Sequence, residues 1–228
     1  MSKRYFTPKL FAFLKDLAEN NDREWFKAHQ DAYEEYVREP ALEFINDFAD
    51  PLKKISKSFV ADSRTVGGSL FRIQRDTRFA KDKTPYKLNT GMQFRHIAGK
   101  DAHAPGFYVH IEPGECFIGV GLWRPETKVA YAIREAIAAE PARWKRVSRG
   151  KRFSDALELG GESLKRPPRG YDEDHPLIDD LKRKDFIASA RITQKAVVSD
   201  HFMEDFGDAC KRSAPFMRFL CDAVGVPF

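Results

Sequence analysis

The chain has 228 residues and a formal net charge of +5, and 42% of its residues are hydrophobic. This composition is typical of a globular protein with a sizeable core and excludes a disordered chain. No apolar run approaches the roughly 20 residues of a membrane-spanning helix, and residues 1–6 show no apolar signal segment. Three cysteines without a C-x-x-C spacing argue against a disulfide framework or a structural zinc site. We therefore expect a soluble cytoplasmic protein with no membrane partner.

Residues 1–58 are predicted to be helical. Thr7–Glu19 carries apolar side chains at helical spacing and predicts an amphipathic helix. Asn21 is predicted to cap the next helix, which runs to about Arg38, because Glu24 stands three residues later as in a capping box. Pro40 suits the first turn of a third helix, where its missing N–H costs no hydrogen bond.

Residues 66–124 change to a period of two and predict strands. The predicted strands are Ser69–Gln74, Lys87–Ile97, Gly106–Glu112 and Cys116–Trp123. The sequence Pro113-Gly114 marks a turn between the last two. A two-residue loop there makes three apolar cross-strand pairs, Ile111 with Cys116, Val109 with Ile118 and Phe107 with Val120. This agreement favours a β-hairpin.

Residues 126–228 return to the helical period, with one further strand predicted at Phe186–Thr193. Helical segments that flank a run of neighbouring strands are typical of an α+β fold. We predict a single α+β domain over residues 1–228. In it, a mostly antiparallel sheet of about four to six strands packs against N-terminal and C-terminal helices.

One face of the predicted sheet collects polar and aromatic side chains. Tyr108, His110 and Glu112 alternate with the apolar residues of their strand. Gly119 and Trp123 share this face on the neighbouring strand, and a glycine there leaves room above the sheet. This pattern favours a groove, although the solvated side of an antiparallel sheet or a face covered by a helix would show it too.

Basic charge is segregated along the chain. Residues 64–100 hold nine Lys and Arg against two Asp, a local charge of +7, and residues 143–152 hold six Lys and Arg with no acid. Subtracting +7 and +6 from the net +5 leaves −8 on the remainder. Uniform solubilisation would not require this segregation, so the basic segments are candidates for binding anions.

The densest basic motif is Arg72–Lys87. Arginine and lysine side chains bind phosphate and carboxylate oxygens, so the motif predicts an anion-binding site. The predicted ligand-binding residues are Arg75, Arg78, Lys81, Lys83 and Lys87, with Tyr86, Tyr108 and Trp123 as walls of the same pocket. In the alternative interpretation the motif is a loop held by internal pairs of its arginines with Asp76 and Asp82.

His110 and Glu112 are the acid–base pair that we take as catalytic candidates. They could also supply two metal ligands, with His96 or His103 as a third, but a single strand histidine is more often only hydrogen-bonded. We therefore predict no metal site. The sequence contains no G-x-S-x-G, P-loop or G-x-G-x-x-G motif, and it identifies neither a reaction nor a cofactor.

The second basic segment, residues 143–152, combines cations with Trp144. Cations neutralise phosphates and aromatic rings stack on bases, so the segment is compatible with nucleic-acid binding. The favoured alternative is a solvated helix face with Trp144 turned into the core.

Five stretches carry a family resemblance: Asn20–Phe26, Arg75–Lys87, Gly106–Glu115, Gly119–Pro125 and Leu164–Tyr171. In these stretches, and over nearly its whole length, the chain resembles the bacterial and fungal proteins grouped as domain-of-unknown-function family 2461. The resemblance implies one compact domain and an intracellular setting. It carries over no catalytic residue and no cofactor.

These features of the sequence support three hypotheses for function. The first is a site that binds, and could act on, a small anionic or phosphorylated ligand through the basic motif and the polar sheet face. The second is nucleic-acid binding through residues 64–100 and 143–152. The third is a structural or interaction module. The negative charge on the remainder of the chain favours the first over the second.

Overall fold

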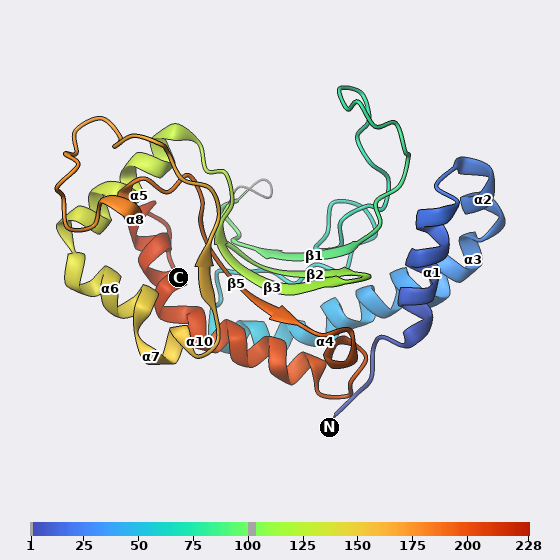
Figure 1. Cartoon of the computed structure of the whole chain (residues 1–228). Helices are drawn as coiled ribbons and strands as arrows, with labels where there is room; N and C mark the ends of the chain where they lie inside the picture. Colours follow the sequence, from blue (N-terminus) through green and yellow to red (C-terminus); the bar gives the residue numbers. More distant parts are fainter. Residues whose placement is uncertain (1, 100–103) are drawn as a thin grey trace.

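An antiparallel sheet lies at the centre of the molecule, with helices against one of its faces (Figure 1). The computed structural model describes residues 2–99 and 104–228. Within these residues the sheet has five strands in the order β1-β2-β3-β5-β4. They are β1 Thr90–Arg95, β2 Gly106–Glu112, β3 Glu115–Leu122, β4 Glu158–Gly160 and β5 Phe186–Ile192. Helices beside an antiparallel sheet confirm the predicted α+β fold.

The β2–β3 hairpin follows the predicted register. Cross-strand partners are Ile111 with Cys116, Val109 with Ile118 and Phe107 with Val120, which confirms the three apolar pairs. Pro113 has its φ fixed near −65° by its ring, and Gly114 has a φ of +88°. A negative φ followed by a positive one is the pattern of a type II turn.

The N-terminal part is helical, as predicted. Its elements are α1 Pro8–Glu19, α2 Arg23–Ala28, α3 Gln30–Tyr33, the π-helical turn η1 Glu34–Arg38 and α4 Glu39–Ile55. The helix predicted to run to Arg38 is interrupted at His29, where φ of −114° and ψ of 19° lie outside the helical region. Pro40 occupies the first turn of α4, as its missing N–H predicts.

The cap of α2 differs from the prediction. Asp22, not Asn21, is the N-cap, and its carboxylate accepts hydrogen bonds from the backbone N–H groups of Glu24 and Trp25 at 2.9 Å. A carboxylate at this position satisfies two donors that the helix leaves unpaired. The side chain of Asn21 is thereby available for a contact elsewhere.

The C-terminal part holds the helices α5 Thr127–Ala139, α6 Pro141–Arg149, α7 Lys151–Ser154, α8 Ile178–Leu181, α9 Gln194–Val197 and α10 Phe202–Ala223. Pro215 lies inside α10, the longest of these helices. In the described part of the chain, no helix is both long enough and apolar enough to cross a bilayer.

Helices α4 and α10 cover the apolar face of the sheet (Figure 1). Phe48 of α4, Phe94 of β1 and Phe206 of α10 are fully buried, with ring centroids 4.7 to 5.3 Å apart. Along β2 the buried residues Phe107, Val109 and Ile111 alternate with partly exposed Tyr108 and His110. Burial of alternate side chains on one side leaves the polar side facing away from these helices.

Two details of the sheet differ from the prediction. The predicted strand Ser69–Gln74 makes only isolated bridges, Leu70 to Met92 and Gln74 to Tyr86, and β1 begins at Thr90 instead of Lys87. The C-terminal part holds β4 as well as β5. The edge strand β4 has three residues, too few for a period of two to be recognised.

Gly121 of β3 is a position where the backbone requires glycine. Its φ is +119°, and a Cβ there would lie 2.1 Å from the carbonyl oxygen of Phe186 in β5. At Gly119, two residues earlier, the nearest atoms to a Cβ would be 3.7 Å away, which is ordinary contact.

We expect Gly121→Ala to lower the free energy of unfolding by about 2 kcal/mol or more, because the strained backbone must shift. The matched variant Gly119→Ala should change it by less than about 1 kcal/mol. Urea unfolding of both variants measures the difference. Equal losses would show that the strain at Gly121 does not affect stability.

Candidate functional site

The face of the sheet opposite α4 and α10 holds an open groove of about 1150 Å³. Its lining comes from β1, β2, β3 and β5, from the segment before β1, and from the start of α9. The lining includes Lys87, Tyr108, His110, Phe117, Trp123 and Arg191. The predicted polar, aromatic face of the sheet is therefore hollowed and lies open.

The register arranges the groove residues in rows across the sheet. One row runs Gly91, His110, Phe117 and Arg191, and the next runs Gln93, Tyr108, Gly119 and Ser189. A Cβ on Gly119 would meet Tyr108 and Phe117 only at 3.7 Å, so the packing of the chain does not demand glycine there. The missing side chain instead deepens the groove between these two rings.

Two cations lie in the groove. Lys87 is partly buried, with its ammonium 5.4 Å from the ring centre of Phe71, and Arg191 is exposed. Burial, and secondly the charge of Arg72, lowers the pKa of Lys87. Among the described residues, neither Lys87 nor Arg191 pairs with a carboxylate. The groove therefore contains two cations without an ion pair in the described chain, and Glu115 is the carboxylate among its lining residues.

A hydrogen-bonded chain of side chains runs along β2 inside the groove. His110 Nε2 lies 2.9 Å from Glu112 Oε2, and His110 Nδ1 lies 3.2 Å from the hydroxyl of Tyr108 and 3.4 Å from the amide nitrogen of Asn89. The ring of Phe117 stacks on His110 at 4.7 Å. Burial, with a smaller contribution from the charge of Glu112, raises the pKa of Tyr108 to about 12. The predicted pair His110 and Glu112 is thus in direct contact, and Tyr108 extends it.

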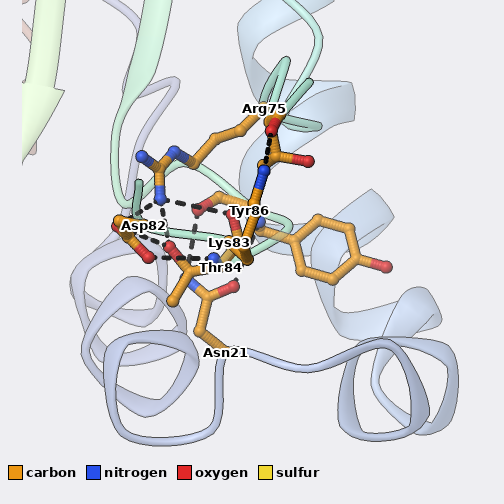
Figure 2. A network of polar contacts seen from close by, with 7 residues as sticks. Asn21, Arg75, Asp82, Lys83, Thr84 and Tyr86 are labelled. Carbon is orange, nitrogen blue, oxygen red and sulfur yellow. Dashed lines mark hydrogen bonds and ion pairs between the residues drawn. The ribbon is translucent and has the colours of Figure 1, made fainter. Parts of the chain in front are cut away.

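The basic motif Arg72–Lys87 forms an arm in which Arg75 and Arg78 pair with carboxylates of the motif itself. Figure 2 shows the pair of Arg75 with Asp82. Arg75 donates to the carboxylate of Asp82 at 2.5 Å, to the carbonyl of Thr84 at 3.2 Å and to the hydroxyl of Thr84. The backbone N–H of Thr84 and then Arg75 lower the pKa of Asp82 to about 2. These bonds close residues 75–84 into a loop.

Two further cations of the arm, Arg78 and Lys83, also bond within it. Arg78 donates to both oxygens of Asp76, at 2.7 and 2.9 Å, and this contact lowers the pKa of Asp76 to about 2. The ammonium of Lys83 donates to the carbonyl of Thr77 at 2.9 Å. Arg75 and Arg78 therefore have the internal carboxylate partners that the alternative, structural interpretation of the motif expects.

Tyr86 anchors the arm to the N-terminal helices. The side chain of Asn21 donates to the carbonyl of Tyr86 at 3.0 Å and accepts from its N–H at 3.1 Å (Figure 2). The ring of Tyr86 stacks on Phe26 of α2 at 4.1 Å. Tyr86 is buried against the helices and is not part of the groove lining.

The structure thus divides the predicted site residues. Lys87, Tyr108, His110 and Trp123 line one groove, and Glu112 contacts His110. The groove lining does not include Arg75, Arg78, Lys81, Lys83 or Tyr86. The prediction missed Ser189 and Arg191, which the period-two alternation of β5 could have placed on the same face as each other.

Part of the basic segment 143–152 has structural partners. Trp144 is fully buried against Phe216 and Phe219 of α10. Arg143 pairs with Glu140 and Asp222, and Arg149 pairs with buried Asp180 at 2.7 Å. A buried Trp144 cannot stack on a base, so the favoured interpretation, with this ring in the core, is confirmed for Trp144.

The histidines do not assemble a metal site in the described chain. Over residues 2–99 and 104–228, no three His, Cys, Asp or Glu side chains are grouped as a metal ion requires. His96 is buried, and its two ring nitrogens contact the carbonyl of Pro227 at 2.6 Å and the N–H of Ala98 at 3.1 Å. The other suggested ligand, His103, lies outside the described residues.

We expect Asn21→Ala to lower the free energy of unfolding by about 1–3 kcal/mol, because the buried N–H and C=O of Tyr86 both lose their partner. The matched variant is Asn20→Ala, since the amide of Asn20 bonds only the nearby carbonyl of Asp16 at the surface. It should cost less than about 0.5 kcal/mol. Urea unfolding followed by circular dichroism compares the two. Equal stabilities would rule out this contact as the anchor of the arm.

Comparison with known proteins assigns the chain to a family without adding a function. A search of curated proteins finds no match. The family model described as "Conserved hypothetical protein (DUF2461)" matches residues 9–219, nearly the whole chain. That match includes both the arm and the groove, and the chain belongs to the DUF2461 family.

Proposed function

We propose that this protein binds a small anionic ligand in the groove on the open face of the sheet. The observation that carries the proposal is Lys87, a partly buried ammonium that faces the groove without a carboxylate partner among the described residues. A buried cation is costly unless an opposite charge compensates it. A bound phosphate or carboxylate would supply that charge.

The rest of the groove suits a ligand that is partly apolar. The rings of Phe71, Tyr108, Phe117 and Trp123 line it, and Arg191 provides a second cation on the strand β5. Mostly apolar walls with a few placed polar groups are typical of small-molecule sites. Gly119 leaves room for a methyl-sized group of a ligand beside Tyr108 and Phe117.

In this proposal the basic arm has mainly a positioning role. Arg75 and Arg78 are paired within the arm, whereas Lys87 stands at its base, where its N–H donates to the carbonyl of Ile73 at 2.8 Å. The Asn21–Tyr86 contact immediately before Lys87 holds this base against α2. The arm therefore delivers one unpaired cation to the groove.

We expect phosphate or pyrophosphate to raise the unfolding temperature of the wild type, since a ligand that binds the native state stabilises it. Lys87→Gln and Arg191→Gln should each weaken binding about 10-fold or more, the value of a hydrogen bond to a charged group. Calorimetric titration with the same anions measures the affinity.

The matched control is Lys81→Gln, which removes the same charge from the arm outside the groove lining. It should leave the affinity unchanged. Loss of binding in Lys81→Gln with full binding in Lys87→Gln would move the anion from the groove to the arm.

A single-stranded nucleic acid is the second candidate ligand, favoured by Phe79. This ring is 95% exposed on the arm, and the guanidinium of Arg78 lies 5.9 Å from its centre. Exposed rings beside cations bind single strands by stacking and charge neutralisation.

For that candidate, affinity for oligothymidylate should fall steeply with salt, with a logarithmic slope of about 0.7 per phosphate contacted. Phe79→Ala should weaken binding by about 1–3 kcal/mol. Val66→Ala, which changes another exposed apolar side chain, is the control. Fluorescence anisotropy at several salt concentrations measures both, and an absence of binding at low salt would exclude this candidate.

A further inference from the structure

On β2, hydrogen-bond contacts link a hydroxyl, an imidazole and a carboxylate in the order found around an activated nucleophile. Tyr108, His110 and Glu112 are alternate residues of one strand and all project to its polar side. The hydroxyl of Tyr108 lies 3.2 Å from His110 Nδ1, and His110 Nε2 lies 2.9 Å from Glu112. A hydroxyl, an imidazole that contacts it and a carboxylate that orients the imidazole are the three parts of a nucleophile–base–acid triad.

The hydrogen-bond partners decide which nitrogen of His110 carries the proton. An ionised carboxylate can only accept, so Nε2 of a neutral His110 must donate to Glu112. Nδ1 is then an acceptor, with two donors near it: the hydroxyl of Tyr108 at 3.2 Å and the amide of Asn89 at 3.4 Å. The shorter contact is that of Tyr108, so its proton lies within reach of the Nδ1 lone pair.

Neighbouring residues fix this geometry. Phe117 stacks on the imidazole at an interplanar angle of 11° and restrains its rotation. Gly91 lies opposite His110 on β1, and a Cβ there would stand 2.6 Å from the Tyr108 hydroxyl oxygen. The glycine thus admits the hydroxyl to its place beside His110. Tyr108 and His110 both line the groove, so a ligand that reacts with Tyr108 would bind there.

We propose that Tyr108 is a catalytic nucleophile, with His110 as its general base and Glu112 as the group that orients His110. The proposal rests on the proposed function for the nature of the substrate, which would be an anionic ester held by Lys87 and Arg191. The Tyr108 oxygen forms a bond to the electrophilic centre of the ester, and the bond to the leaving oxygen breaks. The proton of Tyr108 moves to His110 Nδ1 and then to the leaving oxygen. Glu112 stabilises the imidazolium between these transfers.

Burial makes the role of His110 testable. Because burial raises the pKa of Tyr108 to about 12, its phenolate is scarce at neutral pH. Without a base, Tyr108 should react more slowly than an exposed tyrosine. Fast reaction at neutral pH therefore requires that His110 remove the proton as the bond forms.

The experiment is covalent labelling of the full chain with an uncharged aryl sulfonyl fluoride, followed by mass spectrometry of the peptides. The Tyr108 oxygen forms the bond to sulfur, fluoride leaves, and the proton passes to His110. Tyr36 and Tyr131, both partly exposed, serve as internal references.

We expect Tyr108 to be labelled at least about 10-fold faster than both references, since general-base assistance typically contributes 10²–10⁴-fold. His110→Asn should lower the rate at Tyr108 about 100-fold and Glu112→Gln at least about 10-fold, with the references unchanged. The rate should already be high at neutral pH, far below the raised pKa of Tyr108.

Labelling of Tyr108 no faster than the references would overturn the proposal, as would an unchanged rate in His110→Asn. Constant labelling of Tyr36 and Tyr131 and an unchanged unfolding temperature show that each variant is folded. Because the reagent carries no charge, its reaction does not depend on Lys87 or Arg191. Failure of anion binding and failure of the nucleophile are therefore separate outcomes.

Discussion

The one-sided packing of the sheet is the constraint on which the rest of the structure depends. Phe48, Phe94 and Phe206 pack together between α4, β1 and α10 and are themselves fully buried on the apolar face. Since successive residues of a strand point to opposite faces, this contact also fixes which side chains face away. Tyr108 and His110 face the groove because their neighbours in sequence are buried. Packing of the core thereby positions the groups in which we propose the function.

A second contact joins two distant parts of the sequence. Asn21 bonds the backbone of Tyr86 across 65 residues, and Phe26 stacks on its ring (Figure 2). These residues belong to two of the stretches on which the family resemblance rests, 20–26 and 75–87. The contact between the two stretches gives each a structural role. It anchors the arm beside α2, and Lys87 follows directly after the anchoring residue Tyr86.

The basic motif shows why charge along a sequence is a poor guide to a binding site. Its cations are conspicuous in the sequence, yet Arg75 pairs with Asp82 and Arg78 pairs with Asp76. A count of charged residues along the sequence does not show which charge pairs with which. Surface ion pairs of this kind contribute little to stability. The proposed anion site keeps only Lys87 from the motif and gains Arg191 from β5, more than a hundred residues away in sequence.

The sequence by itself determined the α+β class, the β2–β3 register and the alternation that separates Tyr108, His110 and Glu112 from the apolar core. These features depend on local periodicity and on turn residues, which a single segment contains. Tertiary structure alone decided that Asn21 binds Tyr86 and that Arg191 joins Lys87 in one groove. Each of these arrangements joins residues far apart in sequence, so no local pattern contains the contact that selects it.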